Sequence, residues 1–365
     1  MPAVLTLLGL GAGSPEGISL AALRALRSSR HVWLRTRIHP TVALLQEEGI
    51  GFHTFDEVYE KAESLDVVYP AIVARLLALV ETGEPVVYAV PGHPLVAERT
   101  TELLLEAARD RGLQYQVLSS GSFIDACLQA MERPLPDGLQ VLDAQALPEG
   151  TPDPGLPALF YQVDHPLVAS DLKIRLLDRY PESAEVVVIR AAGVPGEQKL
   201  LQVPLVELDR QEVDHLTSVY VPEVPVTARK PDFPDLVEIV RRLRAPDGCP
   251  WDREQTHASL RKYLLEESYE AIEAIDLKDD ARLCDELGDV LLQVMLHSQM
   301  ASEEDSFTIR EVIEAITTKM IRRHPHVFGD VEVADSQEVL HNWERIKAKE
   351  KGAYSERKSV LDGVP

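Results

Sequence analysis

Acidic side chains recur at helical spacing on two consecutive predicted helices in the last third of the chain. Glu267 and Glu270 are three residues apart in LRKYLLEESYEAIEAID, and Glu286 and Asp289 are three residues apart in ARLCDELGDVLLQVMLHSQM. Residues at this spacing share one face of a helix. Four carboxylates that converge from antiparallel helices suit one or two Mg²⁺ ions, whereas His or Cys at the same places would favour zinc or iron.

An isolated pair of this kind is usually a solvated acidic face. Here the second helix is otherwise apolar around almost its whole circumference, from Leu287 to Leu296, which predicts that the helix is buried. Burying unpaired carboxylates is costly unless a cation or an ion-pair partner compensates them. The two pairs together therefore favour a metal site.

The first helix carries an apolar stripe that is expected to face the core, made of Leu264, Leu265, Ile272 and Ile275. A helical wheel places Glu267 and Glu270 on one flank of this stripe, and Glu266 and Glu273 further out. We therefore expect Glu267 and Glu270 to be the inward pair.

Cationic and aromatic residues follow in the next helices. Lys319 and Arg323 lie one turn apart before Pro325, and Trp343 and Lys347 lie one turn apart in EVLHNWERIKAKEK. Each set permits two interpretations: contacts to phosphate and base, or a basic helix end that complements the helix dipole and ordinary packing. Trp251, in the turn GCPWD, is interpreted as a packing anchor rather than a base platform.

These residues carry a resemblance. The stretch LRAPDGCPWDREQTH, the E-E-x-x-E and E-x-x-D pairs and KMIRRHPHVF together resemble the MazG family of nucleoside triphosphate pyrophosphohydrolases, from about Phe233 to Lys351. The resemblance implies that a nucleoside triphosphate is hydrolysed to the monophosphate and pyrophosphate, by at least a dimer. It implies Mg²⁺ ligands at Glu267, Glu270, Glu286 and Asp289. It implies nucleotide contacts at Arg282, Lys319, Arg322, Arg323, Trp343 and Lys347.

The chemistry assigned to these residues is that of metal-assisted hydrolysis. Lys319 and Arg323 add positive charge where negative charge develops on the phosphates. Glu266, beside the ligand pair, is the candidate base that accepts the proton of the attacking water.

The first part of the chain alternates β-rich runs, glycine turns and helical stretches, which predicts an α/β domain with a mostly parallel sheet. Three loops follow strands: Gly9, Gly11 and Gly13 in LGLGAGS, Pro91 to Pro94 in AVPGHP, and Ser119 to Ser122. Such loops bind ligands at the carboxyl ends of strands, although a purely structural turn is an equally open interpretation. A Pro-rich segment from Pro134 to Pro157 is a candidate hinge between two α/β halves.

In this order the loops resemble those of the tetrapyrrole (corrin/porphyrin) methylases, over about Ala3 to Glu223. The resemblance implies a two-lobed fold that binds S-adenosylmethionine in its cleft, with contacts at Gly9, Gly11, Gly13, Pro91, Gly92, His93 and Ser120. Two positions depart from the family pattern: Ser14 replaces an acidic residue, and P-G-H-P replaces G-D-P. Methyl transfer to a tetrapyrrole therefore stays open. The fusion of the two parts resembles the YabN proteins.

The predicted organisation is thus multidomain: an α/β methylase-like domain at 1–223, a linker at 224–232, an all-α MazG-like bundle at 233–352 and a C-terminal tail at 353–365. The formal net charge of -23 argues against a nucleic-acid polymer as partner, because such binding depends on Lys and Arg. No apolar stretch is long enough for a membrane span. We expect a cytoplasmic homodimer or higher homo-oligomer.

Three functions remain open from the sequence. The first is Mg²⁺-dependent hydrolysis of nucleoside triphosphates by the helical domain. The second is methyl transfer as the main activity, with the helical domain as a dimerising scaffold. The third is a module that senses small molecules without catalysis.

Overall fold

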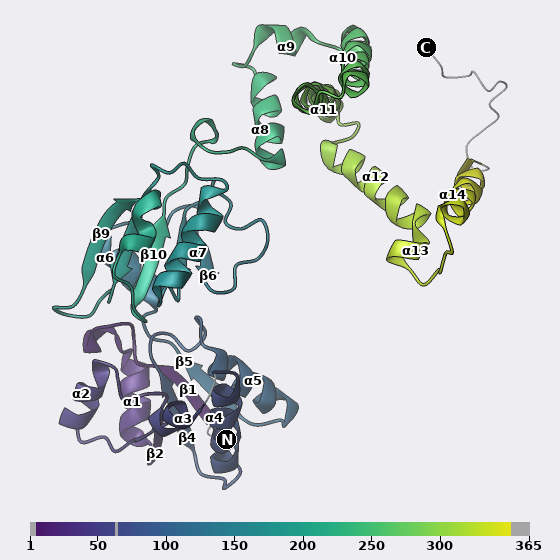
Figure 1. The fold of residues 1–365 in the computed structure, drawn as a ribbon. Helices are drawn as coiled ribbons and strands as arrows, with labels where there is room; N and C mark the ends of the chain where they lie inside the picture. The colour runs from purple at the N-terminus through teal and green to yellow at the C-terminus, as the bar shows by residue number, and fades with distance from the viewer. Residues whose placement is uncertain (1–4, 63–64, 352–365) are drawn as a thin grey trace. The chain divides into compact units, whose positions relative to one another are not determined.

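The computed structural model describes residues 5–62 and 65–351, so the predicted C-terminal tail lies outside the described residues. The chain divides into two compact units, Met1–Pro231 and Asp232–Pro365, which are described separately (Figure 1). Among the helices that the structure describes, none is both long and apolar enough to cross a membrane.

The first unit begins with a five-stranded parallel sheet in the order β3-β2-β4-β1-β5. Its strands are β1 Leu5–Gly9, β2 His31–Leu34, β3 His53–Thr54, β4 Val86–Val90 and β5 Tyr115–Leu118. Its helices are α1 Leu20–Ser28, α2 Thr41–Glu47, α3 Asp56–Lys61, α4 Leu65–Val80 and α5 Arg99–Asp110. The two central strands β1 and β4 are buried throughout, because α1 and α2 cover one face of the sheet and α3, α4 and α5 cover the other.

A second sheet completes this unit, in the order β6-β7-β10-β8-β9. Its strands are β6 Gln140–Asp143, β7 Ala158–Tyr161, β8 Glu185–Arg190, β9 Lys199–Pro204 and β10 Thr217–Val221. One face packs on α7, Pro166–Leu177, and the other on α6, Phe123–Ala130. The prediction of a mostly parallel sheet holds for the first sheet alone, since only β6 and β7 pair in parallel in the second. The candidate hinge segment contains β6 and thus belongs in part to this sheet.

The second unit is helical, as predicted. Its helices are α8 Phe233–Leu243, α9 Pro250–Glu254, α10 His257–Leu277, α11 Asp280–Glu303, α12 Ile309–Arg323, α13 Pro325–Phe328 and α14 Ser336–Lys351. Capping boxes fix the starts of α8, α10 and α12. Figure 1 shows α12 running away from the pair formed by α10 and α11, with α13 and α14 at its far end.

The core of this unit lies at one end of the α10–α11 pair, where α8 packs against it. It consists of Val240, Leu260, Met295, Leu296 and Met300. Two expectations hold only in part for a single copy of the chain: that the apolar stripe of α10 faces the core, and that α11 is buried around its circumference. Ile272 is 51% exposed and Leu287 is 53% exposed, and Leu265, Ile275 and Leu291 are exposed as well.

The reason is that small residues, Ala271 and Ala274, occupy the buried side of α10. The larger apolar residues therefore face outward, on the opposite side of the helix. We call this exposed set the outer stripe of α10: Leu265, Tyr269, Ile272 and Ile275.

Candidate functional site

The acidic residues are brought together by a tight hairpin between α10 and α11. Lys278 ends α10 in the left-handed conformation, with a φ of 55°, and the Asp279 side chain accepts a hydrogen bond from the Arg282 amide at 3.1 Å. This short connection makes the two helices antiparallel neighbours. Residues at equal distances from the turn are then level with each other, which pairs Glu270 with Glu286 and Glu267 with Asp289.

Three of these carboxylates form a compact cluster. Oxygens of Glu267, Glu270 and Glu286 all lie within 4.8 Å of one another. The negative charge of Glu286 is the main cause that raises the pKa of Glu270. Burial, and then the charge of Asp289, raise the pKa of Glu267. Mutual repulsion thus contributes to both raised pKa values, and clustered carboxylate oxygens are the donors that Mg²⁺ prefers.

The remaining acidic candidates lie around this cluster. Asp289 is close enough for its charge to act on Glu267, but it is outside the group joined within 4.8 Å. Glu266 is exposed, and its charge acts on both Glu267 and Glu270. Arg282 donates to Glu273 at 2.6 Å and to Glu286 at 3.3 Å, so it already compensates part of the negative charge.

The cationic candidates gather elsewhere, where α14 packs on α12. The guanidinium of Arg323 lies 5.2 Å from the centre of the Trp343 ring, and the Lys347 ammonium lies 4.9 Å from it. Arg322 and Arg323 both form ion pairs with Glu350, at 2.7 and 2.5 Å. Lys319 is half-buried one turn before Arg323. Figure 1 shows α14 beside the end of α12 that is remote from α10 and α11. The acidic and cationic residues therefore form separate clusters within one copy.

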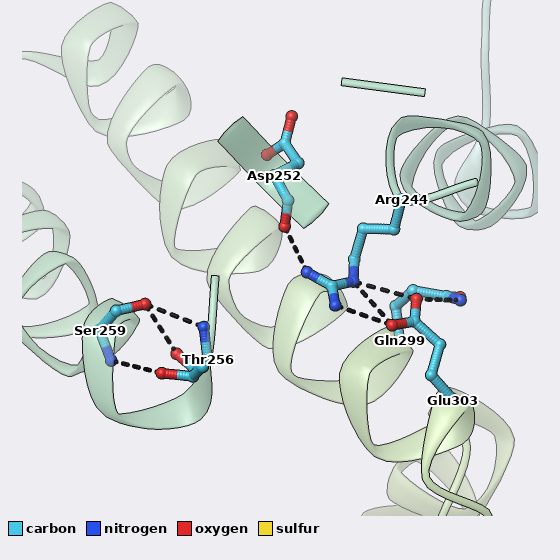
Figure 2. Close-up of polar contacts among 6 residues, drawn as sticks. All are labelled: Arg244, Asp252, Thr256, Ser259, Gln299 and Glu303. Atoms are coloured by element: carbon cyan, nitrogen blue, oxygen red, sulfur yellow. Dashed lines mark hydrogen bonds and ion pairs between the residues drawn. The ribbon is translucent and has the colours of Figure 1, made fainter. Parts of the chain in front are cut away.

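One residue of the predicted motif has a structural function that we did not anticipate. The Arg244 side chain is only 7% exposed and reaches Glu303 at 2.7 Å, and it also donates to the backbone carbonyl of Asp252. Gln299 supports the same carboxylate at 3.0 Å (Figure 2). These contacts tie the end of α8, the α9 turn and the end of α11 together. No sequence pattern indicates this ion pair, because Glu303 lies far along the chain from the motif that contains Arg244.

The prediction that Trp251 anchors the same turn by packing is met in part. Its side chain is 52% exposed, and its ring packs edge to face with Tyr263 at 6.1 Å between centres. Arg244 also holds this turn, since its guanidinium donates to the Asp252 carbonyl, which accepts from the Gln255 amide as well.

In the first unit, a cavity of about 1200 Å³ is lined by residues of both lobes. Of the residues predicted to bind a cofactor, Gly13, Pro91, Gly92 and His93 line it. Gly92 has a φ of 69° and no atom within 4 Å of the place where a Cβ would lie. A ligand in the cavity can therefore approach the Cα of Gly92 closely, while the N–H and C=O of this residue are bonded to Gly11.

Gly9, Gly11, Gly13 and Ser120 also pack closely against neighbouring loops. A Cβ on Gly9 would lie 2.1 Å from the Gly92 carbonyl oxygen, and one on Gly13 would lie 2.4 Å from the Gly193 carbonyl carbon. Gly11 forms a bridge with Gly92. The Ser120 hydroxyl donates to the Gly9 carbonyl at 2.6 Å. These contacts shape the cavity mouth through close backbone packing.

The two folds and the acidic cluster define a fusion of an α/β methylase-like unit with a helical pyrophosphohydrolase-like unit. The chain belongs to the tetrapyrrole (corrin/porphyrin) methylases, whose family model matches residues 4–209. The model of the MazG nucleotide pyrophosphohydrolase domain matches residues 255–328. Both predicted family resemblances are thus confirmed, and with them the fold class.

The chain is similar to several individual proteins. The chain is a homologue of the protein named "Uncharacterized protein YabN" from Bacillus subtilis, with 42% identity over 369 residues that cover 100% of this chain and 74% of that protein. The nucleoside triphosphate pyrophosphohydrolase/pyrophosphatase MazG of Thermotoga maritima is 56% identical over 120 residues, which cover 33% of this chain and 46% of the relative. A uroporphyrin-III-C-methyltransferase from Thermus thermophilus superposes with a TM-score of 0.49 at 25% identity, over 61% of this chain and 93% of that structure.

Proposed function

We propose that the helical unit is a Mg²⁺-dependent hydrolase that converts nucleoside triphosphates to nucleoside monophosphates and pyrophosphate. The observation that carries this proposal is the cluster of Glu267, Glu270 and Glu286, whose oxygens converge within 4.8 Å in the segment that matches the MazG domain. The raised pKa values of Glu267 and Glu270 support it, because a divalent cation would relieve the repulsion that chiefly raises the pKa of Glu270 and that adds to the effect of burial at Glu267.

The residues divide the chemistry among themselves. Glu267, Glu270 and Glu286 would hold the metal, with Asp289 beside them, and Mg²⁺ would supply neutralisation of the phosphate charge and activation of the attacking water. Water attacks the α-phosphorus, the bond to the α–β bridging oxygen breaks, and pyrophosphate leaves. Glu266, which is exposed next to the ligands, accepts the proton of the attacking water. Arg282 orients Glu286 through their 3.3 Å contact.

The cationic cluster is the proposed nucleotide-binding surface. Trp343 offers a ring for the base, and Lys319, Arg322, Arg323 and Lys347 offer charge for the phosphates. Glu350 occupies both arginines. Its carboxylate thus competes with phosphate for their donors.

We further propose that the unit acts as a homodimer. The outer stripe of α10 leaves large apolar side chains exposed, and an exposed apolar row of this kind is typical of a protein interface. In one copy the acidic and cationic clusters are separate. A second copy that covers the stripe supplies the surface that closes the site.

The test is pyrophosphate release from a panel of standard and modified nucleoside triphosphates, with Mg²⁺ and with excess EDTA. We expect metal-dependent release by the wild type and its loss in Glu270→Ala. Asp276→Ala is the matched control, because Asp276 is an exposed acidic residue on the same helix outside the cluster. Release that survives in a folded Glu270→Ala protein would exclude this site, and nucleotide binding without turnover would favour the sensing module.

A second proposal concerns the first unit, whose cleft we propose to bind S-adenosylmethionine. The open space beside the Cα of Gly92 and the match to the methylase family support it. Calorimetric titration of the full chain with S-adenosylmethionine and S-adenosylhomocysteine tests it. Binding of both, together with a failure of every nucleotide to be hydrolysed, would make methyl transfer the main activity.

A further inference from the structure

The charged residues of the first unit's cleft are already paired with one another. Arg35, at the end of β2, forms an ion pair with Glu98, whose side chain is only 2% exposed. The same guanidinium donates to the Tyr59 hydroxyl at 3.0 Å. Because Glu98 is buried against it, Arg35 has its charge compensated before any ligand arrives.

The second arginine of the cleft is bound in the same way. Arg190, at the end of β8, donates to Asp214 from Nε at 2.8 Å and contacts it from Nη2 at 2.7 Å. Glu197 lies 4.0 Å from its Nη1. Asp214 is in turn fixed by the Leu216 amide at 3.0 Å. Such a bidentate contact directs two donors of the guanidinium away from a ligand.

The overall charge of the lining is negative. Among the described residues, the strong acids and bases that line the cavity are Arg35, Arg190, Asp56, Glu98 and Glu197, which sum to one negative charge, and lysine is absent from the lining. Arg37, at the rim, is already paired with Asp56 at 3.1 Å. Burial lowers the pKa of His39 to about 4, so this imidazole is neutral near pH 7.

The backbone marks this cavity as a built site. Ala97, Gln162 and Ala191 line it and have φ values of 53°, 58° and 51°. Residues other than glycine rarely adopt this left-handed backbone conformation, and those that do are concentrated at functional sites. The residues lie in three different loops around one cavity.

From these pairings we infer that the cleft accepts small ligands that are neutral or carry net positive charge, and that it excludes polyanions. S-adenosylmethionine, with a sulfonium, an ammonium and a carboxylate, meets this condition, and so does an acceptor with an amine or a neutral hydroxyl. A polycarboxylate tetrapyrrole does not, and neither does a nucleoside triphosphate. Both bring several negative charges to a lining with no uncommitted cation among its described residues, and like charges without compensation disfavour binding.

This inference rests on the second proposal, that the cleft binds S-adenosylmethionine, but it can be tested separately. The probe is uroporphyrin, a stable polycarboxylate, titrated into the full chain near physiological salt and followed by the quenching of its fluorescence. The charge variant is Asp214→Asn with Glu197→Gln, which releases Arg190. The control is Glu81→Gln with Glu238→Gln, which makes the same change in net charge and releases Arg111 and Arg241 on the surface instead.

We expect wild type and control to bind uroporphyrin weakly and alike, and the Arg190-releasing variant to bind it at least about tenfold more tightly. One-to-one binding to the wild type, as tight as to that variant and displaced by S-adenosylhomocysteine, would overturn the inference. Equal tightening in the control would overturn it as well, since net charge rather than the cleft would then decide. Failure of S-adenosylhomocysteine itself to bind would count against the cofactor proposal, while the uroporphyrin comparison still decides the charge inference.

Discussion

Replacing Ile272 by Asp tests whether a second copy covers the outer stripe of α10. Ile272 is 51% exposed in one copy. Fully burying an isoleucine contributes about 2 kcal/mol, so covering its exposed half contributes about 1 kcal/mol per copy. A symmetric dimer contains the substitution in both copies, so the lost free energy of association is twice this value.

The introduced carboxylate increases the penalty. An ionised group that loses water at an apolar contact without a partner costs at least about 1 kcal/mol more at each copy. Lost burial and added desolvation together come to about 4 kcal/mol for the dimer. The dissociation constant is therefore expected to rise about a thousandfold.

Sedimentation equilibrium over a range of protein concentrations measures this constant directly. Leu20→Asp, at an exposed position at the start of α1, is the matched control, since it places the same charge on the first unit. Circular dichroism checks that both variants keep their helices. We also expect Ile272→Asp to lose pyrophosphate release in parallel with dimerisation.

Two results would refute the reasoning. If the wild type sediments as a monomer at concentrations where it hydrolyses nucleotides, the stripe is not a dimer contact needed for activity. If Ile272→Asp and Leu20→Asp both associate like the wild type, the interface lies elsewhere on the chain.

Further predictions concern the acidic cluster, the Arg244 network and the Glu350 ion pairs. Glu270→Gln is expected to lower Mg²⁺-dependent hydrolysis at least about 100-fold and to raise the melting temperature in EDTA at neutral pH, because one repelling charge is removed; an unchanged rate would contradict the ligand assignment. Since the pKa values of Glu267 and Glu270 are raised on folding, their contribution to stability is present at low pH and is lost as pH rises through the raised values, and Mg²⁺ affinity falls as pH falls through them; melting and Mg²⁺ titrations between about pH 4 and pH 8 check both signs. Arg244→Met is expected to cost about 2 kcal/mol of unfolding free energy in urea titrations, and a loss no larger than that of an exposed Arg would exclude the anchoring role. Glu350→Gln is expected to lower KM for the nucleotide several-fold at constant kcat, whereas a higher KM would mean that Glu350 positions the arginines.

Strong local patterns carried most of the fold prediction. The buried runs of β1 and β4 and the glycine turns after them predict an α/β sheet, and helical periodicity after the linker predicts every long helix of the second unit. The second sheet was harder to predict from the sequence. Strand β9, Lys199–Pro204, is exposed along most of its length, so it has no apolar alternation to report its presence. The antiparallel order of β8, β9 and β10 depends on how the strands pair, which spacing does not encode.

The candidate site was predicted at the level of residue spacing rather than of contact. Three-residue spacing on two helices identifies the acidic pairs, but only the Lys278–Asp279 connection sets Glu270 level with Glu286. The ion pairs of Arg323 with Glu350 and of Arg244 with Glu303 join residues far apart in the chain. No periodicity reports such pairs, because they form only when separate helices pack.

The two units differ in which electrostatic charges lack a partner of opposite sign, and this difference predicts the charge of their ligands. In the helical unit, three carboxylates converge, the pKa values of Glu267 and Glu270 are raised, and among the described residues Arg282 is the cation paired with the cluster. In the cleft, Arg35 and Arg190 each have a carboxylate in contact. A ligand binds best where it supplies the charge that the protein lacks. We therefore expect the helical unit to require a cation before it accepts a polyphosphate, and the cleft to require a ligand that brings no excess negative charge. One chain would then keep both kinds of small molecule apart.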